Sequence, residues 1–361
     1  MHEVVSIPEV LSAWLRDAVA VGASDLHLVP GYPPVLRLHG EIVEQPGPPL
    51  TGDQIHDLLI AFCPTESWSR LQSDKNADFA FGLPINGKFE RFRTNLFFAG
   101  RNLAACMRVV PTDIPNFTWA GFPVALAERL AGLPDGLVIV TGVTGSGKTT
   151  TLAMIVNLLN QAGNNRIITV EDPIEYVYPH VPGSVVSQRE IGPDVRTFAD
   201  GLKFGLRQDP DVILVGEIRD QETAQMALSA AETGHLVFST LHTRDAKGAI
   251  SRYADLFPQD VQRDIRNQLA MSLRCVLSQR LLPDVEKGGK RHLAIEVMWN
   301  IHAIGSAIRT GKLESIDNYL ITHRNEGMIS IDESVRDLLK AGKITRAVAE
   351  QNVRELAVLN R

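Results

Sequence analysis

The pattern of apolar residues changes at about residue 117, from helical spacing with short strand-like runs to apolar runs that alternate with helical stretches. Before it, residues 8–21 carry apolar side chains at helical spacing, and short strand-like runs follow at 25–29 and 34–43. From Asp78 onward, three longer strand-like runs are separated by turns rich in Gly and Asn. This pattern predicts a small α+β domain whose antiparallel sheet has helices on one face.

Beyond residue 124 the pattern is that of an α/β protein. Four apolar runs, at 137–142, 166–170, 211–216 and 236–240, alternate with helical stretches. Such alternation predicts a parallel sheet flanked by helices.

The domain organisation follows from these two patterns and from a segment between them that is rich in proline and has no period. A chain of 361 residues also exceeds what one hydrophobic core usually organises. We therefore predict an N-terminal domain, a linker, an α/β core and a mainly helical C-terminal region, covering residues 1–112, 113–123, 124–283 and 284–361.

Composition narrows the function classes. The net charge of -6, from 36 basic and 42 acidic residues, argues against a protein that coats nucleic acid. The three cysteines, Cys63, Cys106 and Cys275, form no CxxC pair, which favours reduced thiols over disulfides or a zinc site. The chain start does not resemble a secretory signal, and no run approaches the roughly 20 apolar residues of a membrane span. We expect a cytoplasmic protein that meets the membrane through a partner.

The run GVTGSGKT matches the phosphate-binding loop (P-loop) pattern GxxxxGK[ST] and lies between an apolar strand and a helical stretch. Its glycines allow backbone N–H groups to turn inward around phosphates, at the positive end of the following helix. We expect Lys148 to reach the β and γ phosphates of ATP and the Thr149 hydroxyl to bind Mg²⁺. A glycine-rich turn without a ligand is disfavoured by the complete match. The predicted nucleotide-binding residues are Gly142, Val143, Thr144, Gly145, Ser146, Gly147, Lys148, Thr149 and Thr150.

Two later strands end in acidic residues, which could complete a site for hydrolysis. The run VEDPIEY supplies Glu171 and Glu175, and ILVGEIRD supplies Glu217 and Asp220. Both runs can converge on the P-loop because ligands bind at the carboxyl ends of parallel strands. We expect Glu217 to act on Mg²⁺ or its bound water and Glu175 to polarise the attacking water, with Glu171 as the alternative to Glu175. For Asp220, capping of the next helix is the better reading.

Histidines and arginines supply further candidates. His235 precedes one apolar strand and His242 follows it. We expect both near the same end of the sheet, where a histidine could sense the γ-phosphate or contact a neighbouring subunit. Metal binding is not expected, because no ligand-spaced partner is present. Arg91 and Arg93 share one face of a predicted strand, and Arg108 lies on the next strand. On composition alone such arginines are usually solubilising.

Several linked motifs in order give the chain a family resemblance over nearly its whole length. It resembles the secretion ATPase superfamily, and most closely the type IV pilus retraction ATPases (PilT-like). The motifs are ASDLH, GKFERFRTNLF, the P-loop GVTGSGKTTTLA, the Asp box ITVEDPIEY, the Walker B run ILVGEIRD, the His box TGHLVFSTLHT and LSQRLLP.

The resemblance implies a PAS-like N-terminal domain and a RecA-like P-loop NTPase core, with six subunits in a ring and ATP held between a core and an adjacent N-terminal domain. Arg93 and Arg108, and with them Arg101, would then be arginine fingers that stabilise charge in phosphoryl transfer. His235 and His242 would be the His-box histidines. The implied function is a hexameric, Mg²⁺- and ATP-dependent motor that drives pilus retraction and twitching motility through an inner-membrane platform protein.

The chain also departs from this family pattern. Retraction ATPases carry an AIRNLIR-type motif, and the matching run here reads AIGSAIRTGK, at 303–312. The extra N-terminal domain and four-cysteine zinc site of pilus extension and type II secretion ATPases are not found in the sequence, which disfavours an assembly motor. Two alternatives stay open: a type IVB secretion ATPase, and a RecA-like regulatory or nucleic-acid-binding protein.

Overall fold

The computed structural model describes residues 7–38, 41–110, 113–286 and 289–360. The chain forms two compact units, Met1–Asp113 and Ile114–Arg361. Within the described ranges, no helix is long and apolar enough to cross a bilayer.

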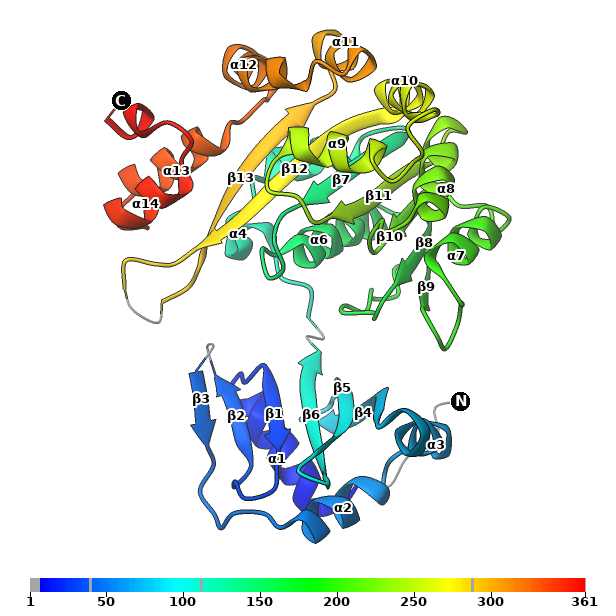
Figure 1. Ribbon diagram of the computed structural model, residues 1–361, viewed down its shortest axis with the longest axis vertical. Helices are drawn as coiled ribbons and strands as arrows, with labels where there is room; N and C mark the ends of the chain where they lie inside the picture. The colour runs from blue at the N-terminus through cyan, green and yellow to red at the C-terminus, as the bar shows by residue number, and fades with distance from the viewer. Residues whose placement is uncertain (1–6, 39–40, 111–112, 287–288, 361) are drawn as a thin grey trace. The chain divides into compact units, whose positions relative to one another are not determined.

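The N-terminal unit is built on a six-stranded antiparallel sheet with the order β3-β2-β1-β6-β5-β4 (Figure 1). Its strands are β1 (Asp25–Leu28), β2 (Val35–Leu38), β3 (Glu41–Glu44), β4 (Asn76–Ile85), β5 (Lys88–Ala99) and β6 (Asn102–Val110), and its helices are α1 (Glu9–Ala20), α2 (Gly52–Ile60) and α3 (Thr65–Asp74). Residues 39–40 of the expected strand run at 34–43 lie outside the described residues.

One core joins the helices of this unit to its sheet. Leu11 and Leu15 of α1 and Leu59 of α2 pack with Leu26 and Met107, which face each other on β1 and β6. Strand side chains alternate between faces, so the residues next to Leu26 and Met107 lie on the other face of the sheet. That face carries the arginines discussed below.

The second unit contains a seven-stranded sheet with the order β13-β12-β7-β11-β10-β8-β9. The four apolar runs predicted as parallel strands are β7, β8, β10 and β11, and their parallel pairing is confirmed. The strands are β7 (Gly136–Thr141), β8 (Arg166–Glu171), β9 (Val185–Glu190), β10 (Val212–Val215), β11 (Leu236–Leu241), β12 (Leu273–Leu282) and β13 (His292–Trp299). The helices up to β12 are α4 (Phe117–Ala120), α5 (Val124–Ala131), α6 (Lys148–Ala162), α7 (Phe198–Gly205), α8 (Gln221–Glu232), α9 (Ala246–Ala254) and α10 (Gln262–Ser272).

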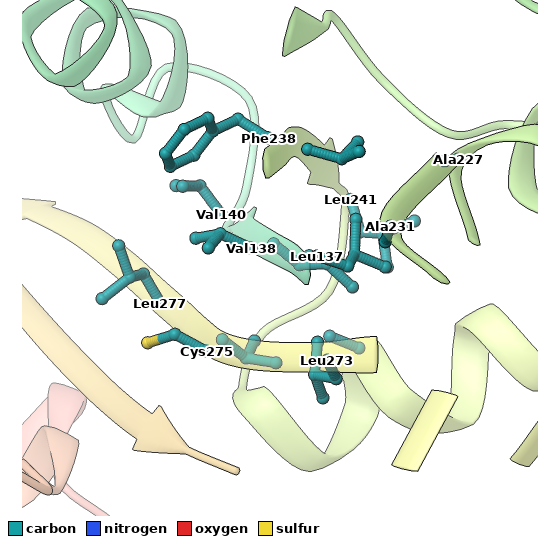
Figure 2. Packing of buried hydrophobic residues seen from close by; sticks show 14 of the residues in the cluster. Leu137, Val138, Val140, Ala227, Ala231, Phe238, Leu241, Leu273, Cys275 and Leu277 are labelled. Carbon is teal, nitrogen blue, oxygen red and sulfur yellow. The ribbon is translucent and has the colours of Figure 1, made fainter. Parts of the chain in front are cut away.

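A cluster of buried apolar side chains joins the central strands of this sheet (Figure 2). Val138 and Val140 of β7 pack with Phe238 of β11 and with Leu277 of β12, all of them buried. Cys275 lies in the same cluster, and burial raises the pKa of its thiol. A rigid sheet of this kind holds the loops at its ends in fixed positions, because packed cores resist deformation.

The region after residue 284 consists mainly of helices, but its first element is a strand that the sequence pattern does not predict. It contains α11 (His302–Thr310), α12 (Ile316–Thr322), α13 (Ile331–Lys340) and α14 (Arg346–Asn352), but first adds β13, which pairs antiparallel with β12. The eight residues of β13 form a short apolar run, and periodicity cannot distinguish such a run from a helical one.

The predicted linker, residues 113–123, is also partly structured. Residues 117–120 form α4, capped by the Asn116 side chain, which accepts a hydrogen bond from Trp119 N at 2.7 Å. Phe122 is buried in the core of the second unit, with Phe117 packed against it. The two phenylalanines give this proline-rich segment enough apolar surface to dock. Residues 111–112 lie outside the described residues.

Candidate nucleotide site

The P-loop joins the end of β7 to the start of α6, where its glycines are required. Gly145 and Gly147 have φ values of +78° and +88°, a conformation that side-chain-bearing residues rarely adopt. A Cβ on Gly142 would lie 2.5 Å from both the Gln279 carbonyl oxygen and Ser146 Oγ. The first turn of α6 therefore directs its free N–H groups into a closely fitted loop, the usual arrangement for binding phosphate.

Lys148, the first residue of α6, is folded into this loop. Its side chain is buried, and its Nζ donates hydrogen bonds to the carbonyl oxygens of Gly142 at 2.9 Å and Val143 at 3.2 Å. Burial lowers the pKa of Lys148, whereas the nearby carboxylates of Glu217 and Glu175 raise it. A buried ammonium beside neutral carbonyls is a strong partner for an anion such as a phosphate oxygen.

Further atoms of the loop also fit a polyphosphate. The Ser146 hydroxyl is buried, and no hydrogen-bond partner for it is found in the described part of the chain. Such a group is costly unless a ligand or water satisfies it. Thr149 Oγ1 donates to Glu175 Oε1 at 3.4 Å, which places a hydroxyl and a carboxylate together at the helix start.

Glu217 lies two residues after β10 and is held from two sides. Arg219 Nη2 is 2.6 Å from one carboxylate oxygen, and His242 Nε2 is 3.4 Å from the other. Burial and the positive charge of Lys148 lower the pKa of His242, and Glu217 opposes this by raising it. The structure thus brings together four of the residues singled out from sequence, Lys148, Glu217, Glu175 and His242.

Glu171, the alternative to Glu175, is used within the sheet. It is 5% exposed, and its Oε1 accepts hydrogen bonds from Thr169 Oγ1 at 2.6 Å and Gln188 Nε2 at 3.2 Å. Burial raises the pKa of Glu171 to about 7, although these two hydrogen bonds lower it. Its oxygens therefore hold β8 to β9. Asp220, expected to be a cap, does cap α8 by accepting from Thr223 N at 2.8 Å.

The two histidines lie at opposite ends of β11. His242 follows the strand at the P-loop end, whereas the His235 carbonyl accepts a hydrogen bond from the N–H of Gly136, at the start of β7. A strand of six residues separates them, about 20 Å at the usual rise per residue. Placing His235 at the phosphate site of its own subunit was therefore wrong, because a residue before a parallel strand lies at the amino edge of the sheet. A contact between His235 and a neighbouring subunit stays a prediction.

The arginines belong to the N-terminal unit, where the register of β5 and β6 sets Arg93 directly opposite Arg108. Arg108 Nε donates to the buried Asp25 at 2.8 Å, and Arg93 Nε lies 3.8 Å from Asp78. Arg101 lies in the turn between β5 and β6, with φ at +70°. The structure thus joins Arg93 and Arg108 on one surface and leaves Arg101 at the end of the hairpin.

A cavity of about 460 Å³ adjoins the P-loop on the side of β12. Sequence reasoning did not single out the individual residues that line it away from the loop, although four of them lie in the LSQRLLP motif. The lining residues outside the P-loop are Arg244, Gln279, Arg280, Leu281, Leu282, Arg291 and Asn352. Apolar and hydrogen-bonding side chains beside a phosphate site suit a nucleoside.

The donor set also suits the expected metal. No group of three or more His, Cys, Asp or Glu side chains that could hold an ion occurs in the described ranges. Mg²⁺ in phosphate sites is usually bound by one or two protein oxygens, with phosphates and waters completing the shell. The Thr149 hydroxyl and the Glu217 carboxylate are oxygen donors of this kind.

A lysine in a glycine cradle, a hydroxyl at a helix start and carboxylates after parallel strands define a P-loop nucleotide-binding protein. The chain belongs to the type II/IV secretion system protein family, whose model matches residues 105–355. The resemblance inferred from the motifs is confirmed.

Individual relatives match nearly the whole chain. The type IV pilus retraction ATPase PilT of Pseudomonas aeruginosa is 39% identical over 336 residues, which cover 93% of this chain and 94% of PilT. The uncharacterized protein YggR of Escherichia coli is 40% identical over 91% of this chain and 97% of its own. The chain is thus homologous to a pilus retraction ATPase over nearly its full length.

Solved structures agree with this assignment. The pilus retraction motor PilT with bound ADP superposes with a TM-score of 0.87 at 40% identity, covering 96% of this chain and 98% of that one. The ATPase DotB of Legionella pneumophila gives 0.83 at 26% identity, with 97% of each chain covered. The α/β fold with two sheet-containing units is therefore confirmed.

Proposed function

We propose that this protein is an ATP hydrolase that works as the motor of type IV pilus retraction. The observation that carries the proposal is the convergence of Lys148, Thr149, Glu175 and Glu217 at one edge of the sheet. The homology to PilT over 93% of the chain supports the pilus role.

Each residue at this edge has a distinct task in the proposal. The P-loop N–H groups and Lys148 bind the β and γ phosphates, and Thr149 with Glu217 holds Mg²⁺. The metal neutralises phosphate charge when it is bound. Glu175 accepts a proton from the water that attacks the γ-phosphorus, and ADP is the leaving group. His242 contacts Glu217 and so keeps that carboxylate oriented.

The nucleoside of ATP occupies the cavity beside the P-loop in this proposal. Leu281 and Leu282 contact the base. The positively charged side chains of Arg244, Arg280 and Arg291 lie near the ribose and the α-phosphate. The nucleotide thereby extends from β12 across the P-loop to the carboxylates after β8 and β10.

The working assembly is proposed to be a ring of six subunits at the cytoplasmic side of the inner membrane. Arg93 and Arg108 of one subunit approach the phosphates bound by the next and stabilise charge in the transition state. Hydrolysis then moves an N-terminal unit against a neighbouring core, with the hinge in the proline-rich linker, and turns a platform protein that removes pilin.

Two measurements test this function. The purified chain should hydrolyse ATP in a Mg²⁺-dependent reaction and sediment as a hexamer. Expressed in a bacterium that lacks its own retraction ATPase, the chain should restore twitching, and Lys148→Ala should not. ATP turnover without any twitching in that strain would remove the retraction role but keep the enzyme.

A type IVB secretion ATPase is the second candidate. DotB covers 97% of this chain with a TM-score of 0.83, and the α11 segment departs from the retraction motif. Complementation of a strain that lacks DotB, with effector delivery as the readout, separates the two candidates. Restored delivery without restored twitching would favour secretion.

A further inference from the structure

A segment that follows α14 lies beside the candidate site. Asn352 lines the cavity at the P-loop, and its carbonyl oxygen accepts a hydrogen bond from Arg280 Nη1 at 2.9 Å. The N–H groups of Arg354 and Glu355 donate to the two oxygens of Asp332, at 2.7 and 3.0 Å. Residues 352–355, here named the C-terminal strap, are therefore fixed by backbone hydrogen bonds on both sides.

The Arg354 side chain in this strap contacts three carboxylates on three other segments. Its Nη2 lies 2.9 Å from Glu296 on β13 and 3.3 Å from Asp245, and its Nη1 lies 2.5 Å from Asp317 on α12. Glu296 is 1% exposed, and Arg354 lowers the pKa that burial raises. The cluster is an internal ionic network, in which losing one partner leaves uncompensated buried charge.

Two of these carboxylates hold the start of α9. Asp245 is the cap of that helix and accepts a hydrogen bond from Gly248 N at 2.8 Å. Glu296 accepts a hydrogen bond from Ala246 N at 2.9 Å. Arg354 orients both carboxylates, so the position of the first turn of α9 depends on the strap.

The turn that enters α9 is the one that carries His242. Thr243 N lies 2.9 Å from the hydroxyl of Thr141, the last residue of β7, and Thr243 Oγ1 donates to the Asp245 carbonyl at 3.1 Å. His242 itself faces Glu217. The turn at 242–245 is thus held at one end by the strand that leads into the P-loop and at the other by the carboxylates that Arg354 binds.

We propose that Arg354 is a positioning residue for the ATPase reaction: through Asp245 and Glu296 it fixes the turn that sets His242 against Glu217. Arg354 thereby controls the rate of hydrolysis through the turn at 242–245, whereas Asn352 of the same strap lines the cavity itself. This inference rests on the proposed ATPase function. A partner that displaced the strap would slow hydrolysis and would also move Asn352 at the nucleoside cavity.

The first experiment compares Arg354→Gln and Arg354→Lys with a matched control, Arg346→Gln. Arg346 lies on α14 and pairs with Glu350 of the same helix at 2.9 Å. For Arg354→Gln we expect kcat to fall about tenfold or more, because the turn would no longer hold His242 in place. KM for ATP and the affinity for a fluorescent ADP analogue should stay within about twofold of wild type. Arg354→Lys should recover part of kcat, and the control should match wild type.

A double-mutant cycle then separates positioning from bracing of the fold. If Arg354 acts through His242, the double variant His242→Ala/Arg354→Gln should be no slower than His242→Ala alone. Independent, multiplicative losses would overturn the proposal. Unchanged kcat in Arg354→Gln would do the same.

Hydrogen exchange gives a readout that does not require activity. The amides of residues 243–248 should exchange faster in Arg354→Gln than in wild type, whereas those of α6 should not change. Unchanged protection at 243–248 would overturn this inference and leave the proposed function standing. A wild-type chain without ATP turnover would remove the proposed function, and the exchange result would still test the link from strap to turn.

Arg354→Gln could unfold because it leaves Glu296 charged and buried. The pair Glu296→Gln/Arg354→Gln removes both charges and keeps hydrogen-bonding side chains of similar size. We expect this double variant to be more thermally stable than Arg354→Gln but to keep its low kcat, because the charged network still does not hold the turn at 242–245. Full recovery of kcat together with stability would contradict a positioning role.

Discussion

The two sheets of this protein gather charged residues in different ways. Among the parallel strands of the second unit, Lys148, Glu175 and Glu217 come from separate segments and meet because β7, β8 and β10 all end at the same edge. In the antiparallel sheet of the N-terminal unit, Arg93 and Arg108 meet because a hairpin register sets them opposite each other. Strand topology brings the charged residues together in the second unit, and hairpin register brings them together in the N-terminal unit.

The difference lies in what each group of charges needs. The edge of the parallel sheet contains both signs, so its lysine and carboxylates stabilise one another. The arginine pair sets two like charges face to face, which is unfavourable by itself. Asp25 lies beside Arg108, and Asp78 lies 3.8 Å from Arg93. The assignment of this pair to the phosphates of an adjacent subunit rests on the family resemblance.

The largest effect is expected at the edge of the parallel sheet. Lys148→Ala removes the cation buried in the P-loop and should lower kcat/KM for ATP by about 10³-fold or more. Steady-state phosphate release measures this loss. Lys203→Ala, at an exposed lysine of α7, is the matched control and should behave as wild type. Substantial turnover in Lys148→Ala would show that the edge is not the catalytic site.

Glu217→Gln tests the carboxylate side of the same edge. It keeps the shape but removes the charge that faces Arg219 and His242, and we expect kcat to fall about 10²-fold with nucleotide binding retained. Single-turnover hydrolysis and binding of a fluorescent nucleotide separate the two steps. Glu222→Gln, on the exposed face of α8, is the control. A loss of binding with unchanged chemistry would contradict the role given to Glu217.

Glu171 should affect stability more than catalysis. Burial raises its pKa to about 7, so between pH 4.5 and 7 the folded state keeps a proton that the unfolded state has lost. This group therefore reduces the free energy of unfolding as pH rises through that window, by about 3 kcal/mol in total.

Glu171→Gln removes this titration. As pH rises from 5 to 8, wild type should lose stability that the variant keeps. The free energy of unfolding of the variant minus that of wild type should therefore increase, as measured by urea denaturation at each pH. A difference that does not vary with pH would contradict the buried, protonated state of Glu171 and return it to the list of candidates for positioning the attacking water.

The smallest effect concerns a residue at the same edge that we regard as structural. Asp220→Ala removes the cap of α8 and should cost about 1 kcal/mol of stability. Thermal unfolding measures this cost, and ATP turnover should stay near that of wild type. Asp220→Asn keeps an acceptor and should recover most of the stability. A large loss of turnover in either variant would place Asp220 among the catalytic groups.

Much of this edge could be predicted from sequence, because β7, β8, β10 and β11 are apolar runs, and the P-loop, the acidic runs and His242 follow them within a few residues. Topology then says where those residues meet. The sequence shows that His235 precedes β11, but not at which edge of the sheet that end of the strand lies. The parallel pairing of β11 with β7 places His235 at the edge opposite the P-loop.

Other features could not be predicted because their partners are distant in sequence and follow no spacing. Arg354 contacts residues 58 and 109 positions before it, Glu296 and Asp245. β13 was missed for a different reason. Its short apolar run resembles a helical one, and only its pairing with β12 decides between them.

The most direct test of the account mixes two inactive proteins. Arg93→Ala and Lys148→Ala subunits, each inactive alone, are combined at equal concentration and allowed to exchange. If Arg93 acts on a neighbour's nucleotide, about a quarter of the interfaces in mixed rings join an intact P-loop to an intact arginine. We predict that ATP turnover then rises well above the mean of the two parents. Turnover that stays at that mean, in rings shown to be mixed, would contradict a site shared between subunits.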